Sequence, residues 1–91
     1  MIDVDEVVSA SDLRNGGRDG ATRYTLGSMK EHADEISELF SYGDPHWKEE
    51  CADMMIHCLC MLRRAGMGER EISAILEKRK KRFLERIAGK P

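Results

Sequence analysis

The chain has 91 residues, 41% of them hydrophobic, and a formal net charge of −2, which describes one small domain with a modest core. No apolar run reaches the roughly 18 residues that a membrane-spanning helix needs, so the pattern excludes a membrane protein. The acidic residues near the N-terminus are unlike the basic start of a signal peptide, and the three cysteines fall within residues 51–60. We therefore expect a reduced, cytoplasmic protein.

The N-terminal segment, residues 1–23, is expected to form a short helix or a mobile loop, because its second half is rich in glycine. From Tyr24 the pattern becomes helical, with Ser28 and Glu31 at capping-box spacing. We expect this first long helix to end near Gly43. Its predicted apolar stripe consists of Met29, Ala33, Ile36 and Phe40.

Asp44 and Pro45 predict the start of a second helix, which should run from about residue 45 to residue 64. This helix is apolar almost all round, which predicts a central position. Its polar residues share one stripe: Glu50, Asp53, His57 and Arg64.

A third helix is expected from about residue 69 to residue 87, after Gly66 and Gly68. Its predicted core side consists of Ile72, Ile75, Leu76, Phe83 and Ile87. The sequence thus predicts an all-α fold, an antiparallel bundle of three to four helices with residues 24–91 as its helical domain. Because so small a core supports little net stability, we expect self-association to complete the bundle.

Charge is distributed unevenly along the chain. Residues 1–53 carry thirteen acidic and five basic side chains, whereas residues 54–91 carry four acidic and ten basic ones. A carboxylate-rich half joined to a cation-rich half suits a site that holds a metal ion and a polyphosphate together.

Two groups of carboxylates could form such a site. Glu31, Asp34, Glu35 and Glu38 share one face of the first long helix, which by itself is typical of a solvated surface. Glu50 and Asp53 lie one turn apart on the apolar second helix, where an unpaired carboxylate is unfavourable. They require either basic partners, such as Arg64 or Arg82, or a bound metal.

Two antiparallel helices that each present an acid pair can bring four carboxylates together, and such a cluster repels itself unless a cation neutralises it. Oxygen ligands favour Mg²⁺, with Mn²⁺ as a substitute. The predicted metal ligands are Glu31, Asp34, Glu50 and Asp53.

The motif Glu31-His32-Ala33-Asp34, followed after fifteen residues by Glu50-Cys51-Ala52-Asp53, resembles the paired motifs of MazG-like nucleoside triphosphate pyrophosphohydrolases. The resemblance covers about residues 24–85 and includes a basic motif on the last helix. It implies an all-α dimer or tetramer that hydrolyses a nucleoside triphosphate to the monophosphate and pyrophosphate. The first motif ends in Asp34 where the family more often has Glu, and Glu35-Ile36-Ser37-Glu38 offers a rival motif, so the first-helix ligands stay open.

The resemblance also implies roles for other residues. Glu35 or Glu38 would orient the attacking water as general base. Lys78 and Arg82 match the basic motif and would bind the phosphates. His57 and Trp47 are candidates for contact with the nucleotide, with a hydrogen-bonded core histidine and a core-capping tryptophan as the alternatives.

Other functions remain as alternatives. The run from Lys78 to Arg82 would suit a dimeric module that binds nucleic acid, although the acidic half of the chain would repel a duplex. A helical interaction module without catalysis is a further alternative. A zinc site at Cys51, Cys58 and Cys60 is disfavoured, because no C-x₂-C pair is present and helical thiols are usually buried.

Overall fold

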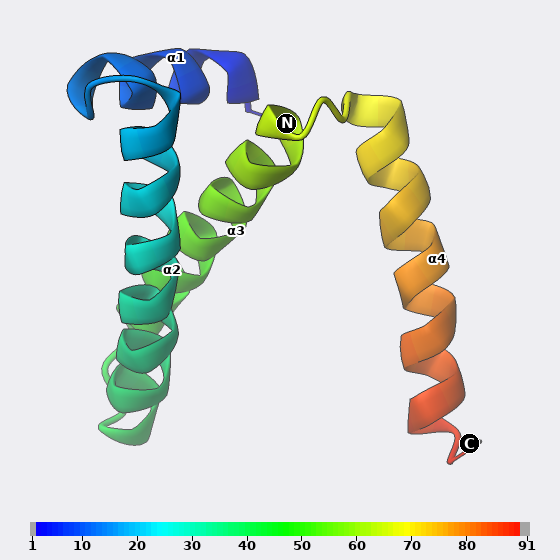
Figure 1. Cartoon of the computed structure of the whole chain (residues 1–91). Helices are drawn as coiled ribbons and strands as arrows, with labels where there is room; N and C mark the ends of the chain where they lie inside the picture. The colour runs from blue at the N-terminus through cyan, green and yellow to red at the C-terminus, as the bar shows by residue number, and fades with distance from the viewer. Residues whose placement is uncertain (1, 90–91) are drawn as a thin grey trace.

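The computed structural model describes residues 2–89, and these form four α-helices (Figure 1). Helix α1 spans Val4–Arg14, α2 spans Arg18–Ser41, α3 spans Trp47–Arg64 and α4 spans Glu69–Ile87. Since the described part of the chain contains no strand, the predicted all-α class is confirmed. None of these helices is long and apolar enough to cross a membrane.

Helices α3 and α4 lie close to the ranges that the sequence predicts. Helix α2 ends before Gly43, whose φ of 73° is a left-handed conformation that glycine adopts without strain. One Asp44 carboxylate oxygen accepts a hydrogen bond from the backbone N–H of His46 at 3.0 Å, just before α3 begins at Trp47. The Asp-Pro signal therefore marks the turn between α2 and α3.

Helix α2 begins at Arg18, earlier than the predicted start at Tyr24, and so runs across the boundary between the two predicted segments. Ser28 is buried within this helix and cannot cap it, which makes the predicted capping box wrong. Gly20 permits the early start. A Cβ atom at Gly20 would lie 2.0 Å from the carbonyl oxygen of Asn15, so only glycine lets the α1–α2 turn fold back this closely.

The face of α2 that packs on α3 is formed by small residues. Ala21, Thr25 and Ser28 are buried at helical spacing, and the Thr25 hydroxyl donates to the Ala21 carbonyl at 2.9 Å. The predicted stripe is only partly correct, since Ala33 and Phe40 are exposed. Small side chains allow the two helices to approach closely. The face with the small residues is therefore the one buried against α3, although larger apolar residues stand one position further along.

Helix α3 is central as predicted, because both α1 and α2 pack against it. Helix α4 differs from the other three helices. Only its first turns lie near them, and the rest of α4 stands apart from α2 (Figure 1). Ile72 is buried, but Leu76, Phe83 and Ile87 are 60%, 56% and 80% exposed. The predicted core side of α4 therefore faces solvent over most of its length in the single chain.

Candidate metal centre

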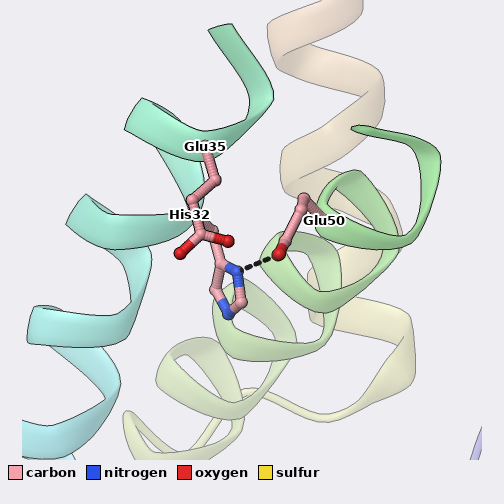
Figure 2. Close-up of side chains that lie close together, drawn as sticks. All are labelled: His32, Glu35 and Glu50. Atoms are coloured by element: carbon pink, nitrogen blue, oxygen red, sulfur yellow. Dashed lines mark hydrogen bonds and ion pairs between the residues drawn. The ribbon is translucent and has the colours of Figure 1, made fainter. Parts of the chain in front are cut away.

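Three side chains from α2 and α3 converge where the two helices face each other (Figure 2). His32 and Glu35 come from α2, and Glu50 comes from the first turn of α3. One ligand atom of each lies within 4.8 Å of the others. Nδ1 of His32 is 2.5 Å from Oε2 of Glu50, and both side chains are mostly buried, at 18% and 19% exposure.

The buried stripe of α2 explains why these residues meet. Ala21, Thr25 and Ser28 face α3, and the same spacing of three and four residues leads on to His32 and Glu35. The turn after α2 then reverses the chain, so the first turn of α3 lies beside the last turns of α2 (Figure 1). Glu50 is thereby brought opposite Glu35.

The two carboxyl groups of this cluster influence each other. A hydrogen bond from Glu35 to Glu50, together with the negative charge of Glu50, raises the pKa of Glu35. The same hydrogen bond and that with His32 lower the pKa of Glu50. Glu50 is thus the group that keeps its negative charge, and Glu35 is the group that holds a proton more readily. A divalent cation between them would relieve the repulsion between two ionised carboxylates.

A short series of aromatic rings runs alongside the carboxylates. The His57 ring lies 5.2 Å from the His32 ring and 6.4 Å from the Tyr24 ring, centre to centre. Burial, followed by the charge of His32, lowers the pKa of His57. His57 is half-buried among these rings, and its position beside His32 keeps it next to the candidate site.

The other predicted carboxylates lie outside this cluster. Glu31, Asp34, Glu38 and Asp53 are exposed. Of the four predicted metal ligands, the structure places only Glu50 in the cluster, and Glu35, predicted as a catalytic residue, lies opposite it. His32 was not predicted. Because His32 lies three residues before Glu35, the two share a helix face, and this spacing could have identified His32 as a candidate ligand.

The remaining predicted residues lie elsewhere in the chain. Trp47 packs edge-on against the exposed side chain of Phe40, with ring centres 5.4 Å apart. Lys78 and Arg82 are exposed on α4, which does not pack against α2. In a single chain they therefore do not reach the Glu35–Glu50 pair.

The predicted basic partners of Glu50 also pair differently. Nη1 of Arg64 donates to Oδ1 of Asp12 at 2.5 Å, and Arg82 lies 3.8 Å from Glu85. The partner of Glu50 is instead His32, which carries a positive charge only when protonated. Cys51, Cys58 and Cys60 are free thiols, and none of them belongs to a group of candidate metal ligands in residues 2–89.

Comparisons of the chain with protein-family models, with curated proteins and with solved structures find no match. The two carboxylates of the cluster are oxygen donors of the kind that Mg²⁺ and Mn²⁺ take, whereas the imidazole of His32 is a nitrogen donor that zinc and other transition metals prefer.

Proposed function

We propose that this chain is a Mg²⁺-dependent pyrophosphohydrolase that converts a nucleoside triphosphate to the monophosphate and pyrophosphate, as part of nucleotide-pool housekeeping. The observation that carries the proposal is the approach of Glu35 on α2 to Glu50 on α3. Glu50 opens the motif Glu50-Cys51-Ala52-Asp53, and Glu35 opens the rival first motif Glu35-Ile36-Ser37-Glu38. The resemblance to MazG-like enzymes rests on the first of these motifs together with Glu31-His32-Ala33-Asp34, of which His32 lies in the cluster.

Glu35, which belongs to the rival motif, is the first-helix carboxylate that approaches Glu50. Helices α2 and α3 run antiparallel, so Glu38 and Asp53 each lie one helical turn from this pair, about 5 Å along their own helices but in opposite directions. Glu31, Asp34 and Asp53 are exposed and outside the cluster. We therefore assign Glu35 and Glu50 as the ligands of Mg²⁺, with Mn²⁺ as a substitute.

The donor set fits such an ion, because the two carboxylates meet with no lysine or arginine paired to either of them among the described residues. Hydrogen bonds with His32 and Glu35 hold Glu50, and a bound ion would replace the one with Glu35. A bound Mg²⁺ would compensate the charge of the triphosphate and polarise a water molecule.

In the reaction that we propose, water adds to the α-phosphorus, the bond from that phosphorus to the bridging oxygen breaks, and pyrophosphate leaves. Glu38 is exposed one turn from Glu35 and is assigned to accept the proton of the attacking water. His57 and Tyr24 border the cluster and would lie along the bound nucleoside.

The proposal includes a second copy of this chain as partner, in a dimer or in a tetramer of dimers. Only Ala21, Cys60 and Ile72 are buried hydrophobic residues in the described part of the chain, so a single copy has a very small core. A groove of about 830 Å³ lies between α3 and α4, and its lining is largely apolar: Met54, Met55, Cys58, Leu59, Leu62 and Leu76. The exposed apolar side of α4 from a second copy of the chain would fill this groove.

Charge favours the same partner. The end of α4 from Lys78 to Arg86 is strongly basic, whereas the end of α2 from Glu31 to Glu38 carries four carboxylates and no lysine or arginine. A basic α4 from one copy can therefore lie near the acidic end of α2 in the other. Lys78 and Arg82 would then bind the phosphates of a nucleotide held at the partner's carboxylates.

The test is pyrophosphate release from a panel of canonical and modified nucleoside triphosphates with Mg²⁺, Mn²⁺ or EDTA. We expect metal-dependent release by the wild type and a loss of about a hundredfold or more in Glu35→Gln and Glu50→Gln. Glu31→Gln removes an exposed carboxylate from the same helix and should leave the rate nearly unchanged. Absence of release from the whole panel by folded protein, or equal losses in all three variants, would contradict the proposal.

A second candidate function rests on the exposed basic run of α4. Five consecutive cations from Lys78 to Arg82 on a helix that stands apart would suit contact with a nucleic-acid backbone. Salt-dependent retention of RNA or DNA by the wild type, lost in Lys80→Gln with Lys81→Gln, would favour this function. Metal-dependent stabilisation without turnover would instead favour an interaction module.

A further inference from the structure

A second candidate site lies at the opposite end of the α2–α3 pair from the carboxylate cluster. It is a hollow of about 430 Å³ between the start of α2 and the end of α3. From Arg23 to Glu35 the helix rises about 18 Å, so this hollow is separate from the candidate metal centre. The polar and charged residues that line it are Arg18, Asp19, Thr22, Arg23 and Arg64.

Arg64 has unsatisfied hydrogen-bonding capacity at this hollow. Its side chain is only 5% exposed, and Nη1 donates to Asp12. Nε and Nη2 are buried and have no hydrogen-bond partner. Buried N–H donors of a charged group are normally paired, so Asp12 compensates this guanidinium only in part and it keeps positive charge beside the hollow.

Two further arginines reach the same hollow from α2. Nη2 of Arg18 donates to the backbone carbonyl of Arg64 at 2.6 Å, which fixes Arg18 across the gap between the helices. Arg23 is exposed, and neither it nor Arg18 forms an ion pair with a carboxylate in residues 2–89. Asp19 is the one acidic side chain in the lining, so the three arginines leave the hollow with a positive charge.

The start of α2 adds to this positive potential. Gly17 occupies the N-cap position and offers no side chain to the free N–H groups of the first turn. Helix N-termini carry partial positive charge and attract anions. The N-terminus of α2 and the three guanidinium groups therefore all add positive potential to the hollow.

We propose that this hollow binds a phosphate group, free or as a monoester, through Arg18, Arg23 and Arg64. A phosphate presents three or more oxygens in different directions, so Arg18 and Arg23 can each bind a different one. Nε and Nη2 of Arg64 are buried, so this guanidinium acts through its positive charge beneath the hollow. This site does not depend on the proposed enzymatic activity.

The test is a calorimetric or NMR titration of the full chain in EDTA, which keeps the carboxylate cluster free of divalent metal. Inorganic phosphate and ribose 5-phosphate are the probes, with acetate at the same ionic strength as the comparison. Saturable binding of inorganic phosphate shows that a free anion suffices, whereas saturable binding of ribose 5-phosphate alone assigns a monoester; either result supports the site.

Arg23→Gln should weaken this binding about tenfold or more, since hydrogen bonds to charged groups are the strong ones. Arg23 is exposed, so this variant should keep the fold, and its circular dichroism verifies that. Arg64→Met removes the buried charge and should weaken binding as well. Arg70→Gln, at an exposed arginine of α4 outside the run from Lys78 to Arg82, is the matched control and should bind like the wild type. No saturable binding, an equal response to acetate, or an equal loss in Arg70→Gln would overturn the proposal.

Discussion

His32 on α2 contacts Glu50 on α3 through Nδ1 and Oε2, and this pair joins the two helices at the level where Glu35 approaches Glu50 (Figure 2). The contact lies at the end of a buried stripe that begins with Ala21. It therefore depends on the packing of α2 on α3, and the carboxylates are positioned by the same small residues that hold the helices together.

Divalent metal should stabilise the protein through these carboxylates. Mg²⁺ or Mn²⁺ at a hundred times its dissociation constant should add about 2.7 kcal/mol to the free energy of unfolding. Glu35→Gln and Glu50→Gln should abolish this gain, and Glu31→Gln should retain it, because Glu31 lies outside the cluster. Thermal unfolding with and without EDTA measures the effect. An equal gain in all three variants would show that the ion binds elsewhere.

The pKa of His46 reports on the turn between α2 and α3. Its hydrogen bond with Asp44, followed by the charge of Asp44, raises the pKa of His46 above 6.5. Because the folded state holds this proton more tightly, the pair stabilises the fold fully below pH 6.5 and loses that contribution as the pH rises through the raised pKa. A ¹H NMR titration should show the raised value in the wild type.

Asp44→Asn should return the pKa of His46 towards its ordinary value, because it removes the larger causes of the shift. The pKa of Asp44 is itself lowered, chiefly by the backbone N–H of His46, so its contribution is present above pH 3.8 and is lost as the pH falls through the lowered pKa. An unchanged His46 titration in Asp44→Asn would mean that the turn does not hold this pair in solution.

Two glycines of α2 should respond in opposite directions to the same substitution. Gly20→Ala places a methyl group 2.0 Å from the Asn15 carbonyl oxygen and should lower the free energy of unfolding by about 1–3 kcal/mol. Gly27→Ala meets no atom within 4 Å and should raise it by about 0.5–1 kcal/mol, because alanine favours helix. Urea unfolding measures both. If the two variants changed stability in the same direction, the close α1–α2 turn would be incorrect.

Self-association should depend on the exposed apolar side of α4. Phe83 is 56% exposed and lies on the side that we assign to a second copy. Phe83→Asp should weaken the dimer by at least about tenfold, since loss of a buried aromatic side chain at an interface usually costs more than 1 kcal/mol. Sedimentation equilibrium measures the dissociation constant. Arg70→Ala, at an exposed position of α4 outside its basic end, should leave it nearly unchanged, and a monomeric wild type would contradict the assembly.

Much of the helical architecture follows from local sequence. The Asp44-Pro45 turn and the glycines at 66 and 68 divide the chain into helices within a few residues of the observed bounds. The start of α2 is different, because it depends on a close approach of Asn15 to Gly20 that periodicity does not reveal. Likewise Ser28 has the local signature of a cap, but packing on α3 buries it inside the helix.

The sequence by itself determined the all-α class and the central position of α3, because hydrophobic periodicity and turn residues act locally. The tertiary structure decided which carboxylate of α2 faces Glu50. Glu31, Asp34, Glu35 and Glu38 share one face in a helical projection, spread over about 100°. The close packing of Ala21, Thr25 and Ser28 on α3 fixes that rotation and turns His32 and Glu35 towards Glu50.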